Sequence, residues 1–241
     1  MIEGDDIAGF SIFWPDNGLD TGPILLQRSC KIKPNDTLDS LYKNYLYPEG
    51  IKAMAEAVDL VAKGTAPMIP QIEERATYDP MLKKKELQKI DWTKPAKKVH
   101  DFIRGLDSTP GAWTTIDGQE VRLFGSTLWT DDKLPEDRIA LQVEDRLGYM
   151  HENGLLIKAI DNQFINVKRM KVGNKTIVAN KFGQQSEKIT LEFTEEEQKN
   201  VETLKSIWEN ILKTDVDEDT DFFACGMWKS ISINILELKL Q

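Results

Sequence analysis

The sequence holds few of the residues from which metal centres and disulfide frameworks are built. Its 241 residues include two histidines and two cysteines. Cys30 and Cys225 lie almost at opposite ends of the chain, so we expect both thiols to be reduced. His100 and His151 lack the spacing of zinc ligands. We therefore predict no metal site, and we expect structural or solvated roles for the two histidines.

Several segments that would define a class of protein are also absent. No apolar run approaches the ~20 residues that a membrane-spanning helix needs. The first residues are acidic rather than basic, so we expect no signal or transit peptide and a cytoplasmic location. Glycine-rich phosphate loops and a G-x-S-x-G motif are missing, which argues against the nucleotide sites and the serine hydrolases that use them.

Positive charge is in short supply. Lys and Arg number 31 against 40 Asp and Glu, which gives a formal net charge of -9. A surface that binds nucleic acid must neutralise many phosphates. Only Lys83–Lys85 forms a basic run, and a run this short is typical of a solvated linker or helix face. We therefore expect small-molecule or protein partners, with no nucleic acid and no membrane.

An α/β unit is predicted for residues 1–80. Residues 8–14 and 22–32 are rich in β-formers and flank a cluster of Pro, Asp, Asn and Gly, which predicts two strands joined by a longer loop. Residues 36–64 carry apolar side chains at helical spacing and predict a long helix. The apolar positions are Leu38, Leu41, Tyr42, Tyr45 and Leu46, followed by Ile51, Met54, Ala55, Val58 and Val61.

The predicted helix has recognisable ends and one interruption. Asp36 or Thr37 can cap its start, and Gly64 suits its end. Pro48 favours a kink or a restart between its two halves. Such a helix needs a sheet to pack on, and two strands make a sheet that is too small to be stable with it. We therefore expect the C-terminal half of an α/β domain whose beginning is absent, or a unit that borrows its neighbour's core.

Residues 81–192 are predicted to form a linker, a short helix and a small β-barrel or sandwich. Pro95 suits the first turn of the helix and Gly105 its end. His100 falls in this helix, whereas we expect His151 in a turn. Short strand candidates separated by turn signals span residues 119–129, 138–144, 154–160, 164–172, 175–182 and 188–193.

Residues 193–241 are predicted to open with one amphipathic helix. Thr194 and Glu197 form a capping box ahead of it. One helix and a tail cannot make a domain, so we expect the truncated start of one. The fold class predicted for the chain is α+β: a partial α/β unit, a small β-barrel and a C-terminal helix. The apolar stripe of that helix is Val201, Leu204, Trp208, Ile211 and Leu212.

The candidate for acid–base chemistry is Asp20, in the loop between the two predicted strands. A loop aspartate can act as a general base when its surroundings tune it and a partner orients the group that it serves. The alternative is that Asp20 and Thr21 close a turn through local hydrogen bonds. Spacing alone favours the turn.

A series of longer motifs is more specific than these signals. In chain order they read GLDTGPILLQ, LYKNYLYPEGIKAMAEAV, GTAPMIPQ, IDW, FIRGLDSTPGAW and DTDFF. Over most of residues 1–223 the sequence resembles the 10-formyltetrahydrofolate dehydrogenase family. The resemblance assigns residues 1–80 to the C-terminal half of a formyltransferase-like hydrolase domain and 81–192 to a linker and its β-barrel. It assigns 193–241 to the truncated start of an acyl-carrier-like domain.

The resemblance also implies a site. In that family the hydrolase domain binds 10-formyltetrahydrofolate and cleaves or transfers its formyl group. It uses an asparagine and a histidine from upstream together with the aspartate of the LDTG loop. That aspartate corresponds to Asp20, and Asn17, Gly18 and Leu19 would lie along the folate. In such a trio one donor stabilises the oxyanion, the imidazole moves protons and the carboxylate orients or deprotonates the attacking group.

The sequence departs from the family pattern in two places. No histidine precedes Asp20, and the only asparagine before it is Asn17. Losing one member of a catalytic unit typically costs orders of magnitude in rate, so we expect the chain to be inactive by itself. Lys229 stands where the family has the serine that carries 4'-phosphopantetheine, and Ser230 comes one position late. We therefore expect no phosphopantetheine here, and the family's NADP-dependent dehydrogenase domain has no counterpart in the sequence.

Two other functions stay open from the sequence. Methionyl-tRNA formyltransferase shares the LDTG loop and the barrel, although the acidic balance of this chain argues against binding tRNA. The second is a non-catalytic fragment that acts only as an interaction partner, with homo-oligomer formation left open. For the cellular location, the resemblance makes mitochondria an alternative to the cytoplasm.

Overall fold

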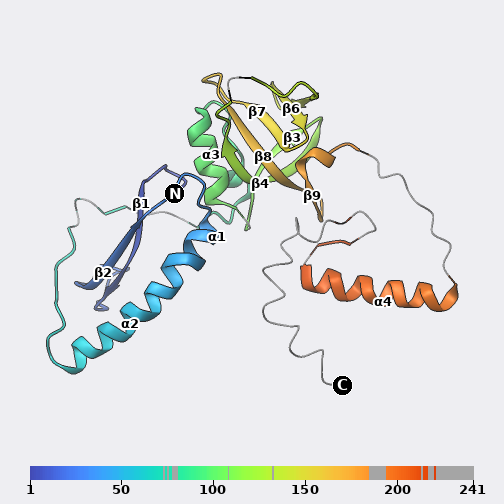
Figure 1. Ribbon diagram of the computed structural model, residues 1–241. Coiled ribbons are helices and arrows are strands. Elements are labelled where there is room, and N and C mark those ends of the chain that lie inside the picture. Colours follow the sequence, from blue (N-terminus) through green and yellow to red (C-terminus); the bar gives the residue numbers. More distant parts are fainter. Residues whose placement is uncertain are drawn as a thin grey trace.

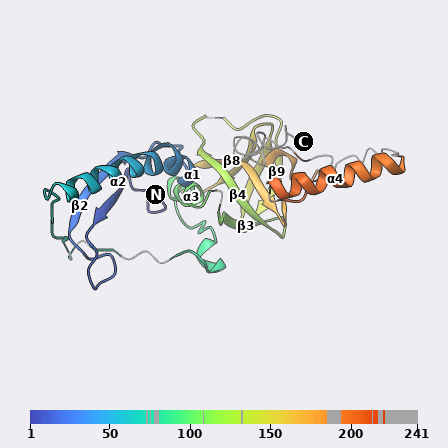
Figure 2. The same cartoon turned by 90° about the horizontal axis from the view of Figure 1, so that it is seen from below.

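The chain folds into three parts in the computed structural model: an N-terminal hairpin with a long helix, a β-barrel and a C-terminal helix (Figure 1). The hairpin unit and the C-terminal helix lie on opposite sides of the barrel in both views (Figure 1, Figure 2). Within the described ranges, no helix has the length and apolar character that crossing a bilayer requires. The structure describes residues 1–72, 74, 76–77, 81–107, 109–131, 133–184, 194–212, 214–216 and 220.

The two predicted N-terminal strands are confirmed as β1 (Ile7–Phe13) and β2 (Ile24–Lys31). They pair antiparallel, and the following linker adds one isolated bridge between Ile24 and Ile69. Among the described residues, β1 pairs with β2 alone. The outer edge of β1 therefore carries no further strand in this part of the chain.

The predicted long helix is confirmed, with one interruption. Thr37 caps its start, because the Thr37 hydroxyl accepts a hydrogen bond from the Ser40 backbone N–H at 3.1 Å. Pro48 lies in the first turn of the last piece, directly after a π-helical turn, so the predicted restart is also confirmed. The three pieces are α1 (Leu38–Leu41), the π-helical turn η1 (Tyr42–Leu46) and α2 (Tyr47–Ala62).

Helix α2 packs on the hairpin through small side chains. Ala53 and Ala57, one turn apart, are buried against Leu25 and Leu26 of β2. Phe10, Ile12 and Trp14 pack against this group but stay partly exposed. The core of the hairpin unit is therefore small.

The predicted β-barrel is confirmed as a closed, antiparallel barrel of six strands. Its order is β4-β3-β5-β6-β7-β8, and pairing of β4 with β8 closes it. A short strand, β9, pairs antiparallel with the C-terminal end of β8. The strands are β3 (Ala112–Ile116), β4 (Gln119–Leu128), β5 (Ile139–Val143), β6 (Arg146–His151), β7 (Gly154–Lys158), β8 (Phe164–Val172) and β9 (Lys175–Val178).

One helix covers the barrel and completes its core. Helix α3 (Ala96–Gly105) begins after Pro95 and ends at Gly105, as predicted. Its buried residues Val99 and Ile103 join the apolar side chains of the strands. The fully buried members from the strands include Ile116, Val121, Leu123, Val143, Leu155, Ile157, Ile165 and Met170.

Two strands of the barrel were not expected. β3 lies within a stretch interpreted as a loop, because Pro110 and Gly111 are turn signals that stand directly before it. β6 contains Gly148, which weakens a strand pattern. The glycine is needed there, since a Cβ would lie 2.9 Å from the side chain of Val143. His151, expected in a turn, is instead the last residue of β6 and is 5% exposed.

The C-terminal helix is confirmed as α4 (Glu195–Leu212), and so is its capping box. The Thr194 hydroxyl accepts from the Glu197 N–H, and the Glu197 carboxylate accepts from the Thr194 N–H. After the helix, Thr214 is hydrogen bonded to the carbonyl of Asn174 at the β8–β9 turn. The expected strand 188–193, Ser230 and most of the tail lie outside the described residues.

Candidate active-site loop

The loop between β1 and β2 is held at its base by the chain that follows α2. The Trp14 N–H donates to the carbonyl of Pro23 at 2.9 Å and closes the loop. The Trp14 indole N–H donates to the carbonyl of Pro67 at 2.8 Å. The Gln71 amide donates to two loop carbonyls, those of Asp20 at 2.8 Å and Gly22 at 2.7 Å. A segment about 50 residues away in sequence therefore fixes the loop backbone.

The side-chain hydrogen bonds of the turn come from Asp16. Its carboxylate accepts from the Gly18 N–H at 3.0 Å and from the Thr21 hydroxyl at 2.8 Å. Gly18 is required by this turn, since a Cβ there would lie 2.0 Å from the Thr21 hydroxyl oxygen. The turn chemistry that the sequence suggested for Asp20 thus belongs to Asp16. An Asp side chain often accepts a hydrogen bond from the backbone N–H two residues later, and this spacing in the turn is the sequence signal for the role of Asp16.

Asp20 has its backbone fixed and its carboxylate unused. Its φ of 57° lies in the left-handed region, which Asp tolerates better than most residues. The side chain is exposed, and its carboxylate makes no hydrogen bond or ion pair with any described residue. The structure therefore presents one free acid on a loop whose main chain is held in place.

The other predicted site residues share this loop. Asn17, Gly18 and Leu19 are all exposed, and Leu19 is exposed to 73%. The loop brings the four predicted residues together, and their contact with folate stays a prediction.

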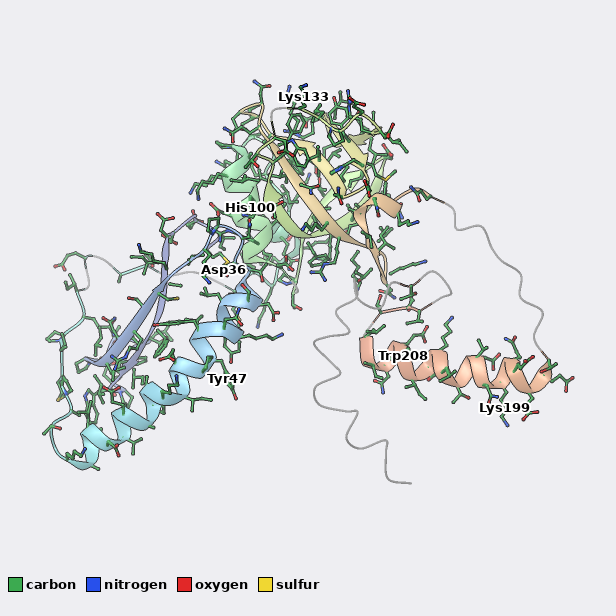
Figure 3. The ribbon with its side chains drawn as sticks, in the orientation of Figure 1. Asp36, Tyr47, His100, Lys133, Lys199 and Trp208 are labelled. Atoms are coloured by element: carbon green, nitrogen blue, oxygen red, sulfur yellow. The ribbon has the colours of Figure 1, made fainter. Side chains whose placement is uncertain are left out.

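A buried polar cluster joins the hairpin unit to the barrel. His100, exposed to 2%, lies between the Ser126 hydroxyl (2.8 Å from Nδ1) and the Pro34 carbonyl (2.9 Å from Nε2). Burial is the main reason that the pKa of His100 lies below its ordinary value of 6.5. The neutral ring then donates from Nε2 to Pro34 and accepts from Ser126 at Nδ1. Figure 3 shows His100 and Asp36 on the two sides of this junction.

An arginine completes the junction. Arg104 donates from Nε to Asp101 at 2.8 Å, and from Nη1 to the carbonyls of Lys33 (3.1 Å) and Asp36 (3.2 Å). Burial raises the pKa of Asp101, but hydrogen bonds from Lys97 and Arg104 outweigh it and hold the pKa below its usual range. Local sequence patterns carry no signal for this contact, because it joins residues about 70 positions apart.

The junction and the candidate site lie at opposite ends of the hairpin. Lys31 and Ile7 pair at the end next to the junction, whereas the Asp20 loop connects the other ends of the strands. A seven-residue strand rising ~3.3 Å per residue separates them by roughly 20 Å. His100 therefore has no part in the chemistry of Asp20, and its predicted structural role agrees with its contacts.

Among the described residues, neither a cysteine nor a metal-binding group lies in the loop. Cys30 is a free thiol in β2, and burial, helped by Asp36, raises its pKa. Cys225 lies outside the described residues. Within those residues no group of three or more His, Cys, Asp or Glu side chains is arranged to hold a metal ion.

Comparisons with known sequences place the loop and the barrel in one family. The formyl transferase family matches residues 1–58, and the C-terminal domain of formyl transferases matches residues 83–187. Mitochondrial 10-formyltetrahydrofolate dehydrogenase from Homo sapiens is 46% identical over 229 residues, which cover 94% of this chain and 25% of that protein. The cytosolic enzyme from Xenopus laevis is 40% identical over 241 residues, which cover 98% and 27%. The chain thus spans about a quarter of the length of these relatives.

A solved structure supports the fold. HypX from Aquifex aeolicus, crystallised in complex with tetrahydrofolic acid, matches with a TM-score of 0.55 and 20% identity. The match covers 74% of this chain and 30% of that one. At this identity the likeness bears on the arrangement of helices and strands alone.

Proposed function

This chain belongs to the formyl transferase family, and we propose that it supplies the aspartate-bearing loop of a site that binds 10-formyltetrahydrofolate and removes its formyl group. The observation that carries the proposal is Asp20. It lies within the part of the chain that matches the family, on a loop whose backbone is fixed, and its carboxylate makes no hydrogen bond or ion pair with the described residues. Relatives 40–46% identical over nearly all of this chain are 10-formyltetrahydrofolate dehydrogenases.

The chemistry assigned to the loop is the handling of the attacking group. A carboxylate at Asp20 would orient a water molecule and accept its proton while the oxygen attacks the formyl carbon. The carbon–nitrogen bond then breaks, and the products are formate and tetrahydrofolate. A donor must stabilise the oxyanion of the intermediate, and a proton must reach the leaving nitrogen. The loop residues Asn17, Gly18 and Leu19 would contact the folate, with Gly18 allowing close approach of the backbone.

Neither histidine of the chain is placed to serve Asp20. Both of its histidines lie beyond the hairpin unit: His100 is engaged at the junction, and His151 is hydrogen bonded to Asn166 in the barrel. Asn17 is the sole asparagine ahead of Asp20. We therefore propose that the chain expressed by itself has no hydrolase activity.

A radioactive formyl-release assay on the purified chain tests this proposal. We expect no release above buffer, and no difference between the chain and an Asp20→Asn variant. Turnover near that of a complete hydrolase domain, lost in the Asp20→Asn variant, would show that the chain carries the whole site. Turnover that survives Asp20→Asn would remove Asp20 from the mechanism.

The alternative of a methionyl-tRNA formyltransferase is less well supported. A tRNA-binding protein needs a basic surface, and the net charge of this chain is -9. We expect no formyl-methionyl-tRNA synthesis, with or without added 10-formyltetrahydrofolate. NADP and 4'-phosphopantetheine were linked by the resemblance to other domains of the family, and Lys229 and Ser230 lie outside the described residues. We propose neither of them as a cofactor of this chain.

A further inference from the structure

A small pocket opens on the barrel around Met150 and His151, and we call it the β6 pocket. It lies between the start of β5, the end of β6 and η4 (Ala179–Lys181), a 3-10 turn after β9. None of its lining residues comes from the hairpin unit. Its volume is about 200 Å³. This is roughly the room that six or seven water molecules fill at ~30 Å³ each, so a ligand of a few heavy atoms fits and a whole folate does not.

A buried histidine gives the β6 pocket its first hydrogen-bond acceptor. His151 is 5% exposed, and its Nε2 lies 3.2 Å from Oδ1 of Asn166. The Asn166 Nδ2 donates to the Asn153 carbonyl at 3.3 Å, so Oδ1 is the acceptor and Nε2 of His151 carries the proton. In the neutral ring Nδ1 is then an acceptor, and it makes no hydrogen bond with any described residue.

An asparagine supplies the second acceptor. The Asn180 Nδ2 donates to the Glu152 carbonyl at 2.7 Å, which fixes the orientation of the amide. Its Oδ1 is buried and has no hydrogen-bond partner within the described residues. Buried acceptors are rarely left without a donor, because the lost contact with water is not replaced. The indole nitrogen of Trp129 is also buried without such a partner, but Trp129 does not line the pocket.

A third acceptor and two carboxylates surround these groups. The Gln184 Nε2 donates to the Asn180 carbonyl at 2.9 Å, which leaves Oε1 of Gln184 as an acceptor. Asp137 and Glu152 are exposed and add negative charge, and no lysine or arginine is among the described residues that line the pocket. The polar groups of the pocket therefore call for a ligand that donates hydrogen bonds and carries positive charge.

The apolar part of the pocket comes from one cross-strand pair. Ile139, the first residue of β5, pairs with Met150 of β6, and both line the pocket. Met150 is buried, whereas Ile139 is exposed to 57%. A short hydrocarbon segment of a ligand can pack against these two side chains.

We propose that the β6 pocket binds a small organic cation with several N–H donors on a short apolar stem: a protonated amine or a guanidinium group. The N–H groups donate to Oδ1 of Asn180 and Nδ1 of His151, and the charge faces Asp137 and Glu152. A metal ion is a poorer match, since no group of three or more His, Cys, Asp or Glu among the described residues is arranged to hold one. This site is independent of the function proposed for Asp20.

Four probes of similar size test the proposed chemistry on the whole chain. Ethylguanidinium and propylammonium carry both charge and N–H donors, tetramethylammonium carries charge alone, and ethylurea carries N–H donors alone. Binding is followed by the NMR signals of the Asn180 side-chain amide and the His151 ring. We expect saturable binding of at least one of the first two probes, and binding at least about tenfold weaker for the other two. No binding of ethylguanidinium and propylammonium overturns the proposal, and so does equal binding of tetramethylammonium or ethylurea.

Two substitutions at one position test the buried acceptor. Asn180→Leu and Asn180→Asp both lose the donor to the Glu152 carbonyl, but Asn180→Asp keeps an oxygen acceptor and adds negative charge. We expect Asn180→Leu to weaken binding of the cation at least about tenfold and Asn180→Asp to retain or tighten it. Equal weakening in the two variants would show that the acceptor has no part in binding, and would overturn the proposal.

An exposed carboxylate provides a test that does not disturb the core. Glu152→Gln keeps the backbone carbonyl that Asn180 uses, and Glu86→Gln is the control because Glu86 is also exposed but lies outside the pocket. We expect a several-fold loss of cation binding in Glu152→Gln and none in Glu86→Gln. Equal losses, or none in either variant, would mean that the pocket does not recognise the charge.

A last comparison identifies the source of the cation. The tripeptide Gly-Arg-Gly presents a guanidinium on a peptide, as a partner protein would, whereas ethylguanidinium is a free small molecule. Binding of the tripeptide at least as tight as that of ethylguanidinium assigns the pocket to an arginine side chain of a partner. Binding of ethylguanidinium with no binding of the tripeptide assigns it to a free small molecule. Either result supports the β6 pocket as a cation site, and binding of neither probe nor of propylammonium overturns it.

Discussion

The β-barrel and the hairpin unit bury their apolar surface to very different extents. In the barrel, pairing of β4 with β8 removes the open edges, and side chains such as Leu155 and Ile165 are fully buried. In the hairpin unit the buried apolar residues are Leu25, Leu26, Leu41, Ala53 and Ala57, while larger side chains on the long helix stay exposed. The barrel closes around its own core, whereas the candidate site lies in the unit with the smaller core.

The junction at α3 is what connects these two regions. His100 and Arg104 extend from the barrel side and hold the chain between β2 and α1 through its backbone carbonyls. Contacts to backbone fix position without depending on the side chains at those residues. The hairpin unit therefore takes its place from the barrel and leaves the Asp20 end free. Four predictions, from the largest expected effect to the smallest, test this difference.

Breaking the junction has the largest expected effect. Arg104→Met removes the buried partner of the Asp101 carboxylate and leaves it only the exposed Lys97, and breaking a buried ion pair costs about 3–5 kcal/mol of unfolding free energy. The same change frees the Lys33 and Asp36 carbonyls. We expect urea unfolding at lower concentration and rapid proteolysis of the hairpin.

The control for this change is Lys97→Met. Lys97 binds the same carboxylate of Asp101 at 2.8 Å, but its side chain is exposed to 58%. An exposed pair contributes at most about 1 kcal/mol. Equal losses of unfolding free energy in Arg104→Met and Lys97→Met would mean that the buried Arg104 contributes no more to stability than the exposed Lys97.

Core truncations in the two regions test whether they unfold separately. Ile157→Ala removes a fully buried side chain from the closed barrel and is expected to cost about 2–5 kcal/mol. Leu26→Ala acts on the small hairpin core, where neighbours are partly exposed and can collapse, so we expect a smaller loss. Hydrogen exchange read separately over residues 154–172 and 7–31 gives the two stabilities. If Leu26→Ala lowers protection from hydrogen exchange in the barrel as much as in the hairpin, the two regions form one cooperative unit instead of two.

The elements with clear local signals were predicted, and the contacts between them were not. β1, β2, the capped helices and most barrel strands follow from apolar periodicity and turn residues. β6 was missed because Gly148, required by close approach of Val143, weakens the local pattern. The contact of His100 with Pro34 spans 66 positions, and local spacing carries no information about it.

The candidate site shows the same limit. Asp20 was a candidate from its place in the loop, and a resemblance supplied its predicted role. The hydrogen bonds of the turn were assigned to the wrong acid, since Asp16 makes them. Gln71, which fixes the backbone of Asp20, gave no signal at all. The periodicity of α2 correctly predicted an apolar helix, but a pattern cannot tell which apolar stripe the chain itself covers.

Acid provides a third test, directed at His100. Because its pKa in the folded protein is lowered by burial, the unfolded chain binds more protons below pH 6.5. The unfolding free energy therefore falls as pH drops from about 7 to 5, by at most about 1.4 kcal/mol per pH unit. The lowered pKa of Asp101 matters only at lower pH, since both states keep that carboxylate charged in this window.

The control for the acid test is His100→Gln. We expect it to be less stable at pH 7 and to show a flatter dependence on pH, measured by urea unfolding at each pH. A slope unchanged by the substitution would place the responsible group elsewhere in the protein.

The smallest effect compares two helix caps in different surroundings. Thr37→Ala and Thr194→Ala each remove a cap that is typically worth about 1 kcal/mol. The helix after Thr37 packs on the hairpin and adjoins the junction, so losing its cap should lower protection from exchange across residues 38–62. Helix α4 has no buried residue in the described part of the chain, and Thr194→Ala should fray its first turn alone. If Thr37→Ala also frays only one turn, the long helix is not coupled to the hairpin on which Ala53 and Ala57 pack.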